Sequence, residues 1–290
     1  MIPDPEALLS MFGLRGQKAL VTGGSVGIGR ACATALAMAG ADVAIVGRKS
    51  EPGERTCESL RAYGVSSFFV TCDVAVSAQV DRMIAEVVDR FGRVDVAINS
   101  AGESAGSSAL QMKEEEWERT LRLNMTGLFW CAQREARQML SQRPRGGRII
   151  NVGSIYATIA GGNCAYNASK AGVAHLTRSL AAEWSSEGIN VNCISPSWTL
   201  TPANRGIPAD MRQRMRELTP KGHLCCHADI HGPVIFLASS ASGFVTGQEL
   251  IVDGGHTVNS WLRPPSRSTP IVADTDLEER ELRVDLERLG

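Results

Sequence analysis

Short apolar runs alternate along the chain with longer stretches in which apolar residues recur at helical spacing. The short runs are almost wholly apolar, without the in–out alternation of a strand that has one wet face, which indicates strands buried on both faces. Strands are predicted at Lys18–Thr22, Val43–Val46, Ser67–Cys72, Val94–Asn99, Arg148–Val152, Asn190–Ile194 and Glu249–Val252.

The stretches between these strands predict helices. The clearest is Ser77–Phe91, where the apolar side chains fall on one helical face. The other predicted helices are Ile28–Ala39, Gly53–Tyr63, a long helix around Glu114–Leu140, Ala165–Trp184 and Asp229–Ser239. Strands that alternate with helices favour βαβ units, so we expect an α/β fold: a doubly wound parallel sheet between two helical layers.

The 290-residue length would allow two domains at about 150 residues each, but α/β folds often reach about 250 residues as one domain. No internal repeat or linker is apparent. We therefore predict an N-terminal arm at residues 1–16, one domain at 17–258 and a charged C-terminal extension at 259–290. The extension contains a charged amphipathic stretch, interpreted either as a solvated appendage or as a segment that packs on a neighbouring subunit.

Composition and charge exclude several classes of protein. The net charge of −1 argues against a broad surface for nucleic acid or for anionic membranes, which would need clustered cations. No stretch approaches the roughly 18 apolar residues of a membrane span, and the N-terminus lacks a signal-peptide pattern. Eight scattered cysteines indicate reduced core thiols, so we expect a cytoplasmic location.

A glycine-rich turn follows the first predicted strand. The segment TGGSVGIG, from Thr22 to Gly29, passes directly into a helix. Glycines let backbone N–H groups approach a pyrophosphate, and the helix N-terminus supplies a partial positive charge. A purely structural turn is the alternative, but the position between a strand and a helix at the start of a βαβ series favours a nucleotide site.

The G-x-x-x-G-x-G spacing of this turn resembles the signature of the short-chain dehydrogenase/reductase family, and further motifs of that family follow in order from about residue 14 to 258. Ser100 is a mild departure, because the family usually has asparagine there. The resemblance implies a Rossmann-like fold and an NAD(P)(H)-dependent oxidoreductase that interconverts a carbonyl and an alcohol. It also implies cofactor contacts from Gly23, Ser25, Ile28, Gly29, Asp73, Val74, Asn99, Ala101 and Gly102.

The end of the second strand predicts the choice of cofactor. A carboxylate at this point would hold the ribose hydroxyls of NAD(H), but the chain has Arg48 and Lys49 after Gly47. Two cations suit the 2′-phosphate of NADP(H), since a guanidinium recognises phosphate well. We therefore expect NADP(H) to be favoured over NAD(H), although both side chains could simply be solvated.

Tyr166 and Lys170 are the candidate acid/base pair. Four residues apart on a predicted helix, they share one face. A neighbouring ammonium favours the phenolate of a group that otherwise titrates near about 10. Tyr156 lacks this partner, because Ala160 stands four residues on. The resemblance further implies that the Tyr166–Lys170 pair contacts the nicotinamide ribose.

Two polar residues complete the catalytic set that the resemblance implies. Ser154 matches the family serine that hydrogen-bonds the substrate oxygen. Asn124 matches the asparagine that helps hold a water in a proton relay to the lysine, and a structural role for this polar side chain is the alternative.

The segment from Pro196 to Thr201 resembles the family segment that lies over the nicotinamide amide. Pro196 and Thr201 keep their places, whereas Ser197 replaces a glycine and Thr199 an aliphatic residue. We include Pro196, Thr199 and Thr201 among the cofactor contacts. The departure at Ser197 puts the local backbone path in doubt.

The rest of the chain says less about the substrate. Residues 200–216 are expected to form a lid, with Arg205 either facing an anionic substrate or solvated. No metal is expected, because His223–His227 fits no common zinc spacing. Family members commonly form dimers or tetramers through the long helices, where Phe129 and Trp130 could serve. The family resemblance implies a small carbonyl or alcohol substrate, whose identity the sequence does not indicate.

Two other functions remain open at this stage. One is a lyase, epimerase or dehydratase that retains its cofactor, and the other is a non-catalytic protein that senses the cofactor on the same fold. The complete set of Asn124, Ser154, Tyr166 and Lys170 argues against the second.

Overall fold

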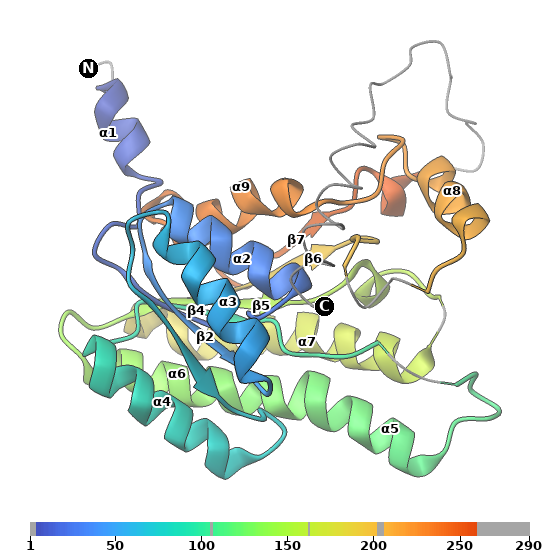
Figure 1. Cartoon of the computed structure of the whole chain (residues 1–290), viewed down its shortest axis with the longest axis horizontal. Helices are drawn as coiled ribbons and strands as arrows, with labels where there is room; N and C mark the ends of the chain where they lie inside the picture. Colours follow the sequence, from blue (N-terminus) through green and yellow to red (C-terminus); the bar gives the residue numbers. More distant parts are fainter. Residues whose placement is uncertain (1–3, 105–106, 162, 202–205, 260–290) are drawn as a thin grey trace.

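A seven-stranded, wholly parallel sheet forms the centre of the protein (Figure 1). The computed structural model describes residues 4–104, 107–161, 163–201 and 206–259. The strand order is β3-β2-β1-β4-β5-β6-β7, so the winding reverses between β1 and β4. The strands are β1 (Lys18–Thr22), β2 (Asp42–Gly47), β3 (Ser67–Thr71), β4 (Val96–Asn99), β5 (Gly147–Val152), β6 (Ile189–Pro196) and β7 (Glu249–Val252).

Helices cover both faces of this sheet, and the predicted doubly wound, three-layer fold is confirmed. Buried side chains from α2, α3 and α9 pack on one face, and those from α4, α6 and α7 pack on the other. The α-helices of the described residues are α1 (Pro5–Ser10), α2 (Gly27–Met38), α3 (Ser50–Arg61), α4 (Ser77–Phe91), α5 (Glu114–Leu121), α6 (Leu128–Ser141), α7 (Cys164–Trp184), α8 (Ala209–Leu218) and α9 (His227–Ala238).

The continuous apolar character of the strands follows from this double cover. Successive side chains of a strand point to opposite faces, so neighbours along one strand enter different cores. Val21 packs in the core beneath α2 and α9, whereas Leu20 packs in the core beneath α4 and α6. Both are 0% exposed, so neither position tolerates a polar side chain without a buried partner.

The predicted long helix around Glu114–Leu140 is continuous, but its middle turn is not α-helical. Between α5 and α6, residues Arg122–Gly127 form a π-helical turn, η1. Gly127 lies at its end, where a Cβ would stand only 2.9 Å from the carbonyl oxygen of Val74. This close approach to the segment after β3 requires glycine. π-Turns are frequent at functional sites, and this one carries Asn124.

Two helices begin two or three residues earlier than predicted. Helix α3 begins at Ser50 rather than Gly53, because Pro52 falls in its first turn, where no backbone donor is needed. Helix α9 begins at His227 rather than Asp229, since the Asp229 carboxylate accepts a hydrogen bond from the backbone N–H of Cys226 (2.9 Å) and caps the helix.

Three segments outside the sheet were predicted only in outline. Residues 209–216 of the expected lid lie in α8. Arg205 and nearly all of the C-terminal extension, from residue 260 onward, lie outside the described residues. Helix α1 of the N-terminal arm projects from the body in Figure 1 and leaves Leu8 and Leu9 largely exposed.

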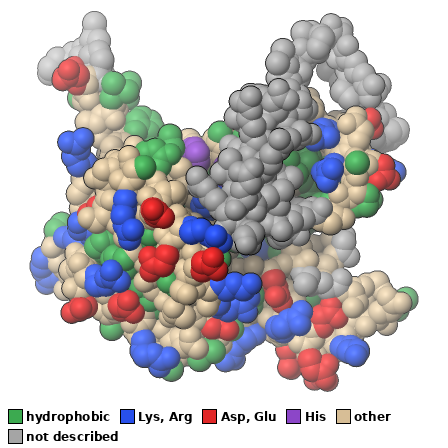
Figure 2. Space-filling view, viewed as in Figure 1, with side chains coloured by type: hydrophobic (Ala, Val, Ile, Leu, Met, Phe, Trp, Pro, Cys, Tyr) green, Lys and Arg blue, Asp and Glu red, His purple; other side chains and the backbone are tan. Residues whose placement is uncertain are grey.

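The surface carries both signs of charge. Figure 2 shows Lys and Arg side chains interspersed with Asp and Glu over the visible face, as the net charge of −1 suggests. No helix within the described ranges has the length and apolar character needed to cross a membrane.

Candidate active site

The glycine-rich turn joins β1 to α2 at the carboxyl edge of the sheet. Gly23 and Gly27 adopt left-handed φ values of +67° and +57°, which favour glycine. A Cβ on Gly29 would stand 2.2 Å from the carbonyl oxygen of Gly23, so the helix packs directly against the turn. Val26, at the N-cap of α2, makes no side-chain hydrogen bond to the helix, so the first backbone N–H groups of α2 can face a ligand.

Ser25 lies in the middle of this turn. Its hydroxyl oxygen is buried and has no hydrogen-bond partner among the residues that the structure describes. A Cβ on Gly47, at the end of β2, would stand 2.8 Å from that oxygen. An unpaired hydroxyl beside a helix N-terminus is what a bound phosphate would satisfy, so the turn fits the dinucleotide that the sequence predicts.

Arg48 and Lys49 follow β2, beside this turn. Both side chains are exposed, and neither takes part in an ion pair among the residues that the structure describes. The two cations are therefore available to an anionic group bound at the edge of the sheet.

The carboxyl ends of β3 and β4 supply the next group of predicted cofactor residues. Asp73 accepts a hydrogen bond from the backbone N–H of Ala75 (3.0 Å), and Val74 beside it is buried. Thr22, in register with Asn99, accepts hydrogen bonds at its hydroxyl from the N–H groups of Ser100 (3.2 Å) and Ala101 (3.4 Å). This ties the turn from Asn99 to Gly102 against the glycine-rich turn.

Tyr166 and Lys170 lie in the first turns of α7. The side chain of Asn163 caps this helix by accepting a hydrogen bond from the backbone N–H of Tyr166 (3.1 Å). Lys170 is 5% exposed; its Nζ donates to the carbonyl oxygen of Val152 (2.7 Å) and lies 5.6 Å from the centroid of the Tyr166 ring. The ammonium and the phenol thus share one face of α7, as the i,i+4 spacing predicts.

Ser154 follows β5 at the same edge of the sheet. Its side chain is buried, and its hydroxyl accepts a hydrogen bond from the backbone N–H of Tyr156 (3.2 Å). The strand end therefore fixes the rotamer of Ser154 next to α7.

Asn124 joins this group from the π-helical turn η1. It is 0% exposed; its Oδ1 accepts from the backbone N–H of Glu103 (2.9 Å), and its Nδ2 donates to the carbonyl oxygen of Glu103 (2.9 Å) and to Ser169 (3.1 Å). A Cβ on Gly102 would lie 3.1 Å from Asn124 Oδ1 and 3.8 Å from Lys170 Nζ. Asn124 thus sits beside the lysine and also ties the segment after β4 to α7.

The segment after β6 closes over the glycine-rich turn. Pro196 ends β6, and Thr199 bonds back to the carbonyl oxygen of Ser197 (3.0 Å). Thr201 is buried, and its side chain lies within 3.2 Å of a Cβ placed on Gly27. The structure therefore brings Thr201 to the N-terminus of α2. Thr199 forms a backbone bridge to Cys225.

Sequence reasoning missed one pairing. Trp198 Nε1 donates to Tyr156 Oη (3.0 Å), and the Tyr156 ring stands edge-on to Tyr166 at 6.1 Å between centroids. The Trp198 ring also packs on His256, with ring centroids 4.3 Å apart. No sequence motif links these residues, because they lie on separate segments that are distant in the sequence.

The sequence predicts no metal site at His223–His227. Over the described part of the chain, no group of three or more His, Cys, Asp or Glu side chains is placed to hold a metal ion. Cys225 and Cys226 are buried.

Comparison with known proteins shows which family the chain resembles. The family model for "Enoyl-(Acyl carrier protein) reductase" matches residues 23–257. The 3-oxoacyl-[acyl-carrier-protein] reductase of Staphylococcus epidermidis is 40% identical over 242 residues, which cover 82% of this chain and 98% of the relative. The 2-dehydro-3-deoxy-D-gluconate 5-dehydrogenase of Escherichia coli is 37% identical over 256 residues, with coverage of 86% and 98%.

Solved structures show the same likeness. A gluconate 5-dehydrogenase from Burkholderia cenocepacia, in complex with NADP and tartrate, superimposes with a TM-score of 0.83 at 35% identity and covers 87% of this chain and 100% of its own. A short-chain type dehydrogenase/reductase from Mycobacterium marinum also gives a TM-score of 0.83, at 34% identity, with coverage of 87% and 100%. The chain belongs to the short-chain dehydrogenase/reductase family of oxidoreductases, which act on CH–OH groups.

Proposed function

We propose that this protein uses NADP(H) to interconvert a carbonyl and a secondary alcohol on a small organic substrate, with Tyr166 as the acid/base. One observation carries the proposal: Tyr166 and the buried Lys170 share a face of α7, next to Ser154 and Asn124. All four lie on segments that meet at the carboxyl edge of the sheet, where the glycine-rich turn also lies. Doubly wound folds bind their ligands at this edge.

Each side chain has a role that its surroundings support. Ser154 orients the substrate oxygen and stabilises charge that develops there. Tyr166 gives a proton to that oxygen in reduction and removes it in oxidation. The positive charge of Lys170 favours the phenolate, and Asn124 lies beside the lysine as the start of a route for resupplying the proton. A bound nicotinamide would supply or accept the hydride.

The preference for NADP(H) rests on Arg48 and Lys49. They present two cations directly after β2, where an NAD(H)-binding site would have a carboxylate. The related gluconate 5-dehydrogenase structure contains NADP, which agrees with this proposal.

Replacing both Arg48 and Lys49 with Ala is expected to raise the Kd for NADPH about 10- to 100-fold, which corresponds to about 1.4–2.8 kcal/mol. This is less than two full hydrogen bonds to charged groups would contribute, because both side chains are exposed and solvent screens their charge. The Kd for NADH should hardly change, since it lacks the 2′-phosphate. Fluorescence titration with both cofactors tests this. Arg82→Ala, which removes an exposed cation on α4, is the control. Equal NADPH and NADH affinities in the unmodified protein would contradict the proposal.

The substrate is proposed only as a class. One relative is named for a 3-oxoacyl group on a carrier protein and another for 2-dehydro-3-deoxy-D-gluconate, so the family likeness spans thioesters and sugar acids. A screen of both classes in the presence of NADPH, with absorbance of the cofactor recorded alongside product formation, distinguishes them. Turnover without any net change in cofactor redox state would instead favour a lyase, epimerase or dehydratase.

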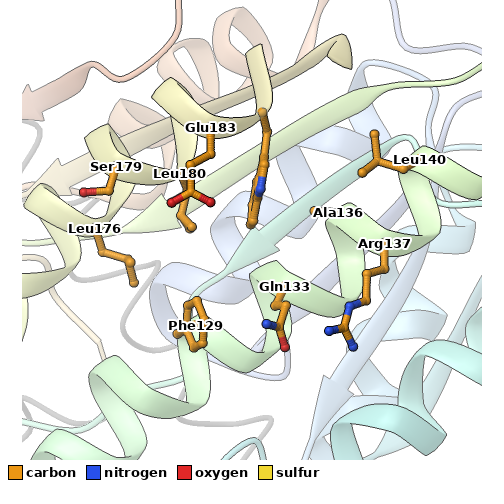
Figure 3. A pocket seen from close by; sticks show the side chains of 10 residues that line it. Phe129, Gln133, Ala136, Arg137, Leu140, Leu176, Ser179, Leu180 and Glu183 are labelled. Carbon is orange, nitrogen blue, oxygen red and sulfur yellow. The ribbon is translucent and has the colours of Figure 1, made fainter. Parts of the chain in front are cut away.

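We also propose that the protein forms a dimer or tetramer through α6 and α7. A hollow of about 350 Å³ lies between these helices, and Figure 3 shows side chains from both converging on it. Its half-buried apolar side chains are Phe129, Leu140, Leu176 and Trp184, and its lining includes Arg137 on α6 and Glu183 on α7. Opposite charges on one patch suit a two-fold contact, in which each copy offers the same surface to the other.

Placing a charge in this hollow is expected to separate the subunits. Leu176→Glu should reduce the mass measured by light scattering to that of a smaller assembly, because two buried carboxylates would face each other across the two-fold axis. Tyr63→Glu, at a half-exposed position after α3, should leave the mass unchanged. A monomeric unmodified protein would refute the proposal.

A further inference from the structure

A carboxyl group that no motif predicts lies inside the molecule. Glu135 is on the inner face of α6 and is 0% exposed. Among the described residues one other carboxyl group is buried, that of Asp95, and it pairs with Arg93 at 2.6 Å. Glu135 has no such cation in the described part of the chain. An ionised carboxylate in this setting is strongly disfavoured.

The hydrogen bonds of Glu135 lead to the floor of the site. Asn99 Nδ2 donates to Glu135 Oε2 (2.9 Å) and to Asn151 Oδ1 (3.3 Å). Asn151 Nδ2 in turn donates to Thr177 Oγ1 (3.0 Å), which donates to the carbonyl oxygen of Val173 (2.9 Å). A single buried polar chain therefore crosses from α6 through β4 and β5 to α7.

Two oxygens in this chain lack partners. Glu135 Oε1 and Asn99 Oδ1 are both buried and accept no hydrogen bond from any described residue. A carboxylate can only accept hydrogen bonds, so it would leave both oxygens unsatisfied. A protonated carboxyl group brings the missing donor, and an acid–amide pair can then form a second hydrogen bond to Asn99. The geometry thus favours the neutral acid.

The surroundings agree with this assignment. The neighbouring titratable group on α6 is Cys131. Burial raises the pKa of its thiol, and the nearby Glu135 and Cys72 raise it further. The neighbouring Arg134 forms an ion pair with Asp81 on α4, with 3.0 Å between Arg134 Nε and Asp81 Oδ1. The groups that β4, β5 and α7 contribute to the chain are neutral amides and a hydroxyl. Burial raises the pKa of Glu135 to about 8, against the smaller lowering effect of the hydrogen bond from Asn99.

Asn99 connects this buried acid to the site. It ends β4 and begins the turn whose N–H groups bond to Thr22. Three residues later the turn reaches Gly102, next to Asn124 and Lys170. Any change in the Asn99 side chain is therefore transmitted to backbone that lines the predicted cofactor site.

We propose that Glu135 is a positioning residue that works as a neutral carboxylic acid: it holds Asn99, and with it the turn from Asn99 to Gly102, and it releases this hold when it loses its proton. The cofactor-facing role rests on the proposed function, whereas the protonation of Glu135 does not. The two are therefore tested separately.

Glu135→Gln tests the cofactor-facing role, because Gln is neutral at every pH and keeps both a donor and an acceptor. Unmodified protein should lose NADPH affinity by about 5-fold or more as Glu135 ionises between about pH 7 and about pH 9.5. Glu135→Gln should show the same affinity as unmodified protein at about pH 7 and lack this loss. Glu118→Gln, at an exposed position on α5, should titrate like the unmodified protein.

Thermal melting tests the protonation without any need for turnover. Between the ordinary carboxyl pKa of 4.5 and about 8, the native state keeps a proton that the unfolded chain has lost. Stability must therefore fall as pH rises through this window, by an amount that Glu135→Gln removes. The variant should thus gain in melting temperature over the unmodified protein as the pH is raised.

Infrared spectroscopy provides a signature on the unmodified protein itself. Near neutral pH, where ordinary carboxyl groups are ionised, the carbonyl stretch of a protonated carboxylic acid should be present and should disappear in Glu135→Gln. Absence of this band from the unmodified protein would overturn the neutral acid, even if the variant did not fold. If the band is present but both proteins lose NADPH affinity alike at alkaline pH, the positioning role is wrong.

Discussion

Replacing Tyr166 with Phe is expected to lower kcat by about 10²- to 10⁴-fold, the usual contribution of a general acid/base. The substitution removes only the hydroxyl, so the ring should still pack against Tyr156 as it does now, at 6.1 Å between centroids. Lys170 would keep its hydrogen bond to the carbonyl oxygen of Val152. The Kd for NADPH should therefore stay within about 2- to 3-fold of its original value, which corresponds to well under 1 kcal/mol.

Tyr156→Phe is the matched control for this prediction. It removes the other phenol near the site, whose hydroxyl accepts a hydrogen bond from Trp198. Losing one such bond should affect KM more than kcat, since it holds the wall of the site rather than the reacting proton. Initial-rate kinetics on both variants show which of the two phenols acts as the acid/base. A larger loss of kcat in Tyr156→Phe would transfer the acid/base role to that residue, and a parallel loss of NADPH affinity in Tyr166→Phe would contradict its assignment.

Gly29→Ala is expected to weaken NADPH binding at least about 100-fold and to destabilise the fold by about 1–3 kcal/mol, a typical consequence of overpacking. The new Cβ would lie 2.2 Å from the carbonyl oxygen and 2.7 Å from the carbonyl carbon of Gly23. Both are backbone atoms, so no side chain can rotate away. The turn itself must shift, and its N–H groups then no longer face the phosphate position.

Gly232→Ala provides the comparison, because it makes the same change inside α9. A Cβ there meets nothing within 4 Å, and the position is exposed. Removing a helical glycine should stabilise the protein by about 0.5–1 kcal/mol and leave NADPH binding unchanged. Urea unfolding and fluorescence titration measure both quantities. Equal cofactor affinity in the two variants would show that the glycine-rich turn is not the phosphate site.

Much of the fold could be predicted because burial imposes simple periods on the sequence. Helix α4 has the predicted bounds, Ser77–Phe91, since one apolar face packs on the sheet and the other face is wet. The strands were recognisable because both of their faces are covered. The boundaries of α3 and α9 were less accurate, since they depend on a proline in a first turn and on one capping carboxylate.

The site was predictable where its residues form short motifs. The glycine-rich turn and the Tyr166–Lys170 pair each lie within one local segment, so their geometry follows from the turn or helix that carries them. The hydrogen bond between Trp198 and Tyr156 could not be predicted, because the two residues are 42 positions apart and meet only when β5 and β6 pair. The π-turn at Asn124 also left no mark in the apolar pattern.

The sequence by itself predicted the order of strands and helices along the chain, a nucleotide-type turn and a candidate acid/base pair. These depend on spacings of a few residues, within which the chain has little conformational freedom. Only the tertiary structure decided that Glu135, one polar residue among many on a long helix, lies against Asn99 in the interior. Whether a carboxyl group is solvated or buried depends on what packs over it, and for Glu135 those neighbours come from strands β4 and β5.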